Sequence, residues 1–253
     1  IAVDLKNTDQ LPPSKIQEFS NFIRPRAPLS IQPIFVSPEY TYVQVVSNVK
    51  YNINETSLNS DDIRVIVTSA IQNFNLINLN GFNKTLYYSN LVSDIDTSQA
   101  AFISNDTQIS AIKTFVPQVL SAQNYDIDFG MSFVNDLSRI DNQRDQTKRT
   151  TISSTPFFFA GEQCTLEDDG IGNMRIMASN IPNLPGRRKV QDIGTVNYET
   201  GVIKLVGFEP QSLVGNELRI FARIRERDIT SQRRTILSIR DEDIRVNVEQ
   251  VRI

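Results

Sequence analysis

The hydrophobic period of the chain changes near residue 128, and this change most constrains the fold. Before it, one long run repeats apolar residues at helical spacing: Ile63, Ile66, Val67, Ala70, Ile71 and Phe74. After it, short segments alternate between apolar and polar residues and are separated by turn sequences. The pattern predicts an α+β protein, in which a small α/β unit is followed by a mainly β domain.

We expect three regions along the chain. Residues 1–38 hold six of the 11 prolines and predict an extended lead-in, because proline fixes φ and biases its predecessor toward extended geometry. One short helix interrupts the lead-in, with Ser14 as its cap and Pro25 as its end. Residues 39–128 are the predicted α/β unit, and residues 129–253 the mainly β domain. Three apolar residues share one face of the short helix: Ile16, Phe19 and Ile23.

The α/β unit is predicted to run strand, helix, helix, strand, strand. Residues 39–50 are β-branched and aromatic, which is typical of a strand. Ser60 is expected to cap the first helix, since acidic residues follow it in the first turn, and Asn80-Gly81 to end it. The second helix is expected near residues 86–95. The two strands are expected near residues 101–104 and 109–115.

Turn chemistry organises the second half. Residues 195–198 and 202–206 flank Glu199-Thr200-Gly201 and predict a hairpin. Residues 167–173 are acidic but lack the spacing of a calcium loop, so a plain hairpin turn is expected. Residues 138–154 contain only two aliphatic side chains. That composition predicts a loop, with a mobile arm as the alternative.

Composition excludes several classes of function. The chain has no histidine, which removes histidine-dependent nucleophiles and general bases and nearly every catalytic zinc site. Its one cysteine, Cys164, permits no intrachain disulfide and favours a reducing compartment. A net charge of −3 supplies no cationic field for nucleic acid or anionic lipid, and no apolar run is long enough for a membrane helix. We therefore expect no enzyme, no metal and no cofactor. A glycosidase needs only paired carboxylates, but no acid stands out and tryptophan is absent.

Residues 218–227 carry the most distinctive surface pattern. Leu218, Ile220, Ala222 and Ile224 alternate with Arg219, Phe221, Arg223, Arg225 and Arg227, which predicts a strand with a row of arginines on one face. In residues 129–253, 15 of the 18 basic residues are arginine. A solvated face paired with acids on neighbouring strands is one interpretation. The other is a protein–protein contact, because arginines around an aromatic residue are interface composition.

A second candidate contact is Phe157-Phe158-Phe159, which places phenylalanine on both faces of one strand. A strand covered on both sides is one interpretation, and a subunit contact the other. The candidate interface residues are thus Arg219, Phe221, Arg223, Arg225, Phe157 and Phe159.

Three segments resemble a known family: residues 11–52, the helix sequence at 61–75 and the hairpin at 194–203. They are similar to the baseplate J-like wedge proteins of contractile-tailed, T-even-like bacteriophages, of the gene-six type, in their C-terminal part. Since the chain begins with Ile1, we expect it to be a piece of a longer protein.

The resemblance implies a structural protein of the virion's tail baseplate, assembled in the host cytoplasm. Such proteins pair with themselves, as dimers within a larger ring, and join other wedge subunits around the tail hub. The resemblance implies no catalytic residue, no nucleic acid and no membrane. A receptor- or carbohydrate-binding β module of a phage tail is the competing hypothesis, and it would require an exposed aromatic groove.

Overall fold

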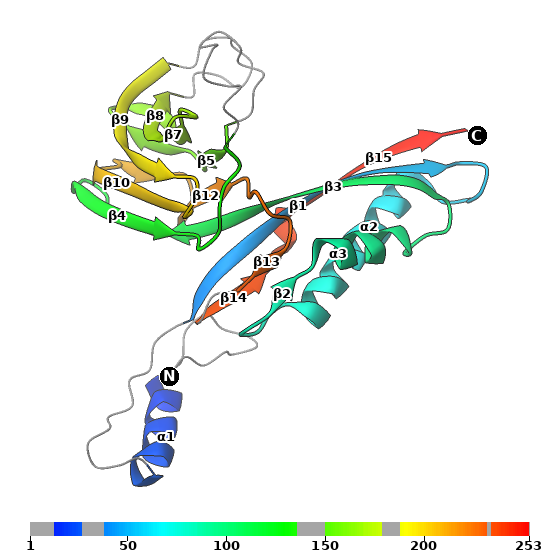
Figure 1. The fold of residues 1–253 in the computed structure, drawn as a ribbon, viewed down its shortest axis with the longest axis horizontal. Coiled ribbons are helices and arrows are strands. Elements are labelled where there is room, and N and C mark those ends of the chain that lie inside the picture. Colours follow the sequence, from blue (N-terminus) through cyan, green and yellow to red (C-terminus); the bar gives the residue numbers. More distant parts are fainter. Residues whose placement is uncertain (1–12, 27–37, 136–149, 179–187, 232–233, 253) are drawn as a thin grey trace.

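The structure, a computed structural model, describes residues 13–26, 38–135, 150–178, 188–231 and 234–252. Two long strands, β1 (Glu39–Asn52) and β3 (Phe102–Phe115), run through the molecule. At one end they join a strongly curved group of strands, and at the other they form an arm covered by helices (Figure 1). This arrangement confirms the predicted α+β class, with strands dominating.

One mixed sheet contains most of the strands. From β1 it continues through β3 to five further strands and then to β10 (Val202–Phe208) and β4 (Gln123–Asp128). The five are β12 (Leu218–Ala222), β5 (Ile152–Ser154), β7 (Glu162–Asp168), β8 (Asn173–Ala178) and β9 (Arg188–Asn197). Beside β7 lies β6 (Phe157–Phe159), which also pairs with β11 (Ser212–Leu213). A separate pair joins β2 (Thr85–Leu86) to β13 (Ile229–Thr230).

The end of the described chain returns to its first strand. β14 (Thr235–Ser238) pairs in parallel with residues 39–42 of β1. After the 3-10 turn η3 (Asp241–Asp243), β15 (Ile244–Val251) pairs in parallel with residues 45–52. A domain boundary at residue 128 stays a prediction. Although β14 and β15 belong to the second half of the sequence, they lie beside β1 rather than within the curved group (Figure 1).

Two helices cover one face of the arm. The longer, α2 (Ser60–Asn78), buries one stripe against the sheet, and α3 (Tyr88–Asp96) packs beside it. The stripe consists of Ile63, Val67, Ile71 and Phe74. These residues recur every three or four positions, as the sequence period requires of a helix with one buried side. Ile66 and Ala70 have the same period but are only half-buried.

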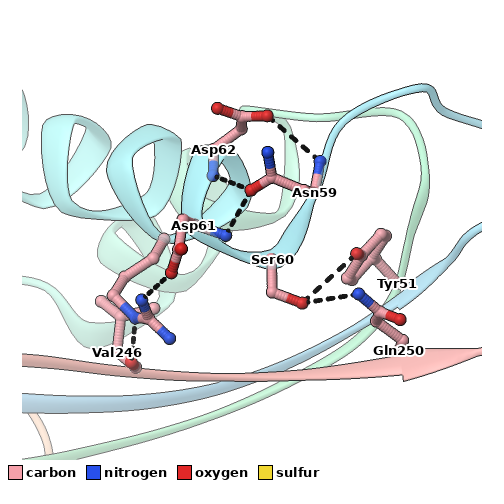
Figure 2. A network of polar contacts seen from close by, with 8 residues as sticks. Tyr51, Asn59, Ser60, Asp61, Asp62, Val246 and Gln250 are labelled. Carbon is pink, nitrogen blue, oxygen red and sulfur yellow. Dashed lines mark hydrogen bonds and ion pairs between the residues drawn. The ribbon is translucent and has the colours of Figure 1, made fainter.

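Asn59 caps α2, and the expected cap, Ser60, is the first helical residue. The side-chain oxygen of Asn59 accepts from the backbone N–H groups of Asp61 and Asp62, at 2.8 and 3.0 Å. The carboxylate of Asp62 accepts from the N–H of Asn59 at 3.1 Å, which completes a capping box (Figure 2). An amide oxygen accepts from these N–H groups as well as a hydroxyl does. Because Asn59 and Ser60 are adjacent and both residue types are good helix caps, the sequence alone does not decide which of the two is the cap.

The freed hydroxyl of Ser60 instead attaches α2 to the sheet. It accepts from the side-chain amide of Gln250 on β15 at 2.8 Å and lies 3.4 Å from the hydroxyl of Tyr51 (Figure 2). One turn later, Nε of Arg64 donates to the carbonyl oxygen of Val246 at 3.3 Å. The N-terminal end of α2 is therefore held over the last strand.

Other boundaries also differ from expectation. The strands expected at 101–104 and 109–115 are one 14-residue strand, β3, because the polar residues between them keep their pairing with β1: Asp106 and Gln108 are exposed, and the buried hydroxyl of Thr107 hydrogen-bonds to Ser47 and Asn105. The first helix, α1 (Pro13–Ile23), begins one residue before Ser14, and Pro25 lies inside the 3-10 turn η1 (Arg24–Arg26) that follows. No residue of α1 is buried. Most of the loop expected at 138–154 lies outside the described residues, and its end forms β5.

The predicted hairpin is confirmed as β9 and β10, which pair Asn197 with Val202. Gly194 pairs with Leu205 of β10, and the two backbones lie close together there. A Cβ at this position would sit 1.8 Å from the carbonyl oxygen of Lys204, so no larger residue fits without moving the backbone. The turn between β7 and β8 is likewise a plain hairpin turn, in which Asp169 accepts from the N–H groups of Ile171 and Asn173.

Candidate protein interface

The arginine strand is shorter than its sequence pattern predicts. Regular pairing of β12 ends at Ala222, and beyond it Ile224 makes a single bridge to Phe133. Leu218, Ile220 and Ala222 are buried, as the alternation requires. The three arginines that follow lie beyond the end of the strand, so the four arginines of the pattern do not form one continuous row.

Arg219 lies within the fold rather than on a free surface. Its side chain is 15% exposed and forms ion pairs with Glu242, at 3.0 Å, and with Asp243. Burial raises the pKa of the Asp243 carboxyl, although the hydrogen bond and charge of Arg219 oppose that effect. Nε of Arg219 and Oδ2 of Asp243 have no hydrogen-bond partner among the described residues. Arg219 therefore connects β12 to the turn between β14 and β15.

Arg240 extends this connection to β1. Its guanidinium lies 3.5 Å from the ring centroid of Tyr42 and pairs with Glu217 at 2.7 Å and Glu242 at 3.1 Å. Burial alone would lower the pKa of Arg240, but hydrogen bonds with Tyr42, Glu217 and Glu242 outweigh burial and raise it. We call Glu217, Arg219, Arg240, Glu242 and Asp243 the ion network.

The remaining arginines of the pattern are more exposed. Arg225 makes a bidentate pair with Glu199, at 3.0 and 2.7 Å, which lowers the pKa of the Glu199 carboxyl. Arg227 lies over the ring of Tyr88, 4.8 Å from its centroid. Arg223 is exposed and forms no ion pair with any described residue. The solvated interpretation therefore fits Arg225, whereas no acid in the described ranges neutralises Arg223.

The three phenylalanines divide between core and surface. Phe157 is fully buried and meets the ring of Phe208 edge-on, with centroids 5.2 Å apart. Phe159 is half-buried, as is Phe221 of the arginine strand, which lies beside Arg219 at 5.4 Å. Phe158, which the interface hypothesis left out, is 41% exposed. Period-2 alternation in β6 accounts for this, since Phe157 and Phe159 share one face.

The arm has an open polar face opposite its helices. Side chains there form a cross-strand ladder: the amide of Asn247 donates to Asn48 Oδ1 at 2.8 Å, and the amide of Asn48 to the carbonyl of Asp106 at 3.3 Å. Lys50 and Glu249 pair beside them at 2.9 Å. These contacts align three strands and give this face a surface of amides and charges.

The arm also has open edges. β12 pairs with β3 only at residues 111–115, so residues 102–110 have β1 as their one strand neighbour within the described chain. β15 likewise pairs only with β1 among the described strands. Unpaired strand edges are sites at which another chain can add hydrogen bonds.

The helices bear apolar surface that the sequence interpretation did not single out. Val65, Leu76 and Ile77 of α2 are exposed, and Ile77 is 74% exposed. They lie outside the buried stripe, and a count of apolar residues beyond that stripe would have revealed them.

The described residues contain neither a candidate metal site nor a helix that could span a membrane. Among the described residues, no group of three or more histidine, cysteine, aspartate or glutamate side chains could hold a metal ion. Cys164 is buried, and burial raises the pKa of its thiol. No helix in the described ranges is both long and apolar enough to cross a membrane.

Comparison with known families identifies one segment. Residues 39–114 match the family model described as baseplate structural protein gp6, C-terminal domain III. The match begins at the first residue of β1 and ends one residue before the end of β3, so it includes β1, β3 and both helices of the arm but not β15. No protein of curated function matches the chain.

Proposed function

We propose that this chain, whose residues 39–114 carry C-terminal domain III of the baseplate structural protein gp6, associates with itself and with other wedge subunits to form a ring around the tail hub. The family makes the protein a structural component of the virion tail baseplate. The role that we propose is non-enzymatic, with proteins rather than nucleic acid or membrane as partners.

The open arm is the observation that carries this proposal. Its helices and its strands β1 and β3 lie within the matched segment, whereas β15 does not. The arm combines a polar face with two strands, β3 and β15, whose outer edges lack a strand neighbour in the described chain. A subunit of a closed ring must meet a neighbour on each side, and an extended arm offers separate surfaces for this. A groove of about 420 Å³ between α2 and the end of α3 is lined by no aromatic side chain, which does not favour carbohydrate binding there.

Within the arginine pattern, Arg223 and Arg225 are the residues that we propose for a subunit contact. Arg223 is exposed and has no ion partner among the described residues, and Arg225 pairs with Glu199 at the surface. Carboxylates of a neighbouring subunit would form charge-assisted hydrogen bonds with these guanidinium groups. The half-buried rings of Phe221 and Phe159 complete the proposed contact. Arg219 and Phe157 support it from within the fold.

The test is the double variant Arg223→Glu/Arg225→Glu. If the contact is buried, self-association weakens at least ~10-fold, with an unchanged circular dichroism spectrum. Sedimentation velocity at several concentrations measures this, alone and with other wedge subunits. The matched control is Arg188→Glu/Lys189→Glu, which makes the same charge change at two exposed surface pairs.

Equal association of the variant, the control and the original chain would remove Arg223 and Arg225 from the interface. A chain that stays monomeric at every concentration and binds no wedge subunit would contradict the assembly role itself. Hydrolysis of peptidoglycan by the isolated chain would contradict the non-enzymatic role.

A further inference from the structure

The outer edge of β15 is open to another strand. Among the described strands, β15 pairs only with β1, and it lies at the margin of the arm, away from the curved group (Figure 1). Its eight residues include no proline or glycine, and its register with β1 runs without a bulge. Prolines, bulges and very short strands are common means of keeping an edge from pairing, so this edge is competent to add a strand.

The peptide groups of β15 point alternately to its two sides. The carbonyl oxygen of Val251 accepts from the N–H of Ile53 at 3.1 Å, which continues the pairing with β1. The carbonyl oxygen of Val246 instead accepts from Nε of Arg64 at 3.3 Å (Figure 2). Odd-numbered residues of β15 therefore face β1, and even-numbered residues face the open edge. A carbonyl oxygen has two lone pairs, so that of Val246 can accept from a second donor.

The side chains on the polar face of β15 are complementary to themselves. Arg245 and Glu249 lie on either side of Asn247 at equal spacing, and all three are exposed. If two copies of β15 pair antiparallel about Asn247, Arg245 of each copy lies opposite Glu249 of the other. Asn247 then lies opposite its counterpart, and an amide can both donate and accept. The same register places Val246 opposite Val248, and the peptide groups of both face the open edge.

The charges of this pattern are available to a partner. Arg245 forms no ion pair with any described residue. Glu249 pairs with Lys50 at 2.9 Å, but both side chains are largely exposed, and a carboxylate can accept from a second cation as well. Opposite charges that face each other across an antiparallel pair stabilise it. The open edge of β3 lacks this property, because Asp106 is the one charged residue in 102–110 and a second copy would offer it no base.

We propose that β15 of one copy pairs antiparallel with β15 of a second copy, in the register that places Asn247 opposite Asn247. The sheets of the two arms then form one continuous sheet, with a two-fold axis perpendicular to it and α2 of both copies on the same face. Such a contact is isologous and closes with two copies, so a ring requires a second, different contact. This inference rests on the proposed self-association and names one of its contacts.

Charge reversal tests the contact. Arg245→Glu and Glu249→Arg should each weaken self-association of the full chain at least ~10-fold, because both copies carry the change and two attractive pairs become repulsive. An equimolar mixture of the two variants should recover association, since one chain then carries acids at both positions and the other carries arginines. Sedimentation velocity measures both effects. The matched control is Arg188→Glu with Glu162→Arg, which reverses an exposed ion pair within one copy and should show neither the loss nor the recovery.

Disulfide formation tests the register. The two Asn247 residues would form a non-hydrogen-bonded pair, in which the Cα atoms lie ~4.5 Å apart, within the range of a disulfide. Asn247→Cys should therefore give a disulfide-linked homodimer on oxidation. Glu249→Cys is the matched control, because it is exposed on the same face but lies opposite Arg245 rather than its own counterpart. Both chains keep Cys164, which is buried.

The outcomes separate this inference from the proposed function. Chains that self-associate, yet tolerate both reversals and link no better through Asn247→Cys than through Glu249→Cys, would overturn the β15 contact alone. Reversals that weaken association without recovery in the mixture would overturn the charge pairing that fixes the register, and the contact with it. Reversals that spare self-association but abolish binding of another wedge subunit would assign the edge to that subunit instead. Chains that remain monomeric in every measurement would overturn both proposals.

Discussion

The guanidinium of Arg219 on β12 pairs with the carboxylate of Asp243, whose side chain is only 1% exposed. The two residues are 24 positions apart and connect the middle of the sheet to the turn that separates β14 from β15. The pair holds the turn at which β14 ends and β15 begins, and both of these strands are parallel neighbours of β1.

Asp243→Ala should lower the free energy of unfolding by about 3 kcal/mol, because it leaves Arg219 largely buried and without its most enclosed partner. Urea denaturation followed by circular dichroism measures the change. Glu249→Ala, which breaks the exposed pair with Lys50, is the control and should cost under ~1 kcal/mol. Equal effects of the two changes would mean that the ion network contributes no more than a surface pair.

Asp169→Ala should destabilise the protein in a pH-dependent manner. Burial would raise the pKa of this carboxyl, but hydrogen bonds from Asn173 and Ile171 and the charge of Arg175 outweigh burial and lower it. A lowered pKa in the folded state means that the stabilisation is complete above the unfolded value of ~3.9 and is lost as the pH falls through the folded value. The difference between variant and original should therefore be about 1 kcal/mol at pH 7 and shrink below about pH 4. Urea denaturation at pH 7, 4 and 3 checks this, and a difference independent of pH would exclude the charge as its source.

Gly194→Ala should cost about 3 kcal/mol or lead to a misfolded hairpin, since the added methyl group would overlap the backbone of Lys204 and β9 is paired on both sides. Thermal unfolding measures the loss. Gly81→Ala is the matched control, because its new Cβ would meet only the flexible side chain of Lys84 at 3.5 Å. A small shift for Gly194→Ala would show that β9 and β10 can separate more easily than their pairing implies.

Asn59→Ala should lower stability by about 1 kcal/mol, because two backbone N–H groups at the start of α2 lose their acceptor. Ser57→Ala, an exposed position two residues earlier, should have no measurable effect. Chemical denaturation distinguishes them. If both variants behave like the original chain, water replaces the cap at no cost.

The sequence predicted elements whose signals are local. The stripe from Ile63 to Phe74 contains a helical period, and the β9–β10 hairpin has its own turn sequence, so both were found. The strand β3 was divided in two because its polar middle resembles a break when its neighbours are unknown. Parallel pairing of β14 and β15 with β1 depends on contacts across the whole chain, which no local pattern specifies.

The candidate interface was harder to predict for a similar reason. Alternation correctly placed Leu218, Ile220 and Ala222 in the core, but it could not show that Arg219 meets Asp243 or that pairing stops after Ala222. The same row of like charges in a sequence is compatible with two structures. Acids from a distant turn can pair with the charges, or solvent can hydrate them. Alternation along β6 requires neighbouring phenylalanines to face opposite sides. Because the three residues are identical, the sequence does not reveal whether Phe157 or Phe158 faces the core.

The return of β15 to β1 also sets the order in which the arm can form during synthesis. Asn48 and Asn247 are 199 positions apart, yet they hydrogen-bond across adjacent strands. The ribosome must therefore release nearly the whole chain before α2 finds the strand that anchors its first turn. At ~5–20 residues per second, the helices of the arm wait on the order of ten seconds or more with part of their sheet missing. Long-range pairing of this kind slows folding, and during that interval the nascent arm exposes the edge of β1 to pairing with other chains.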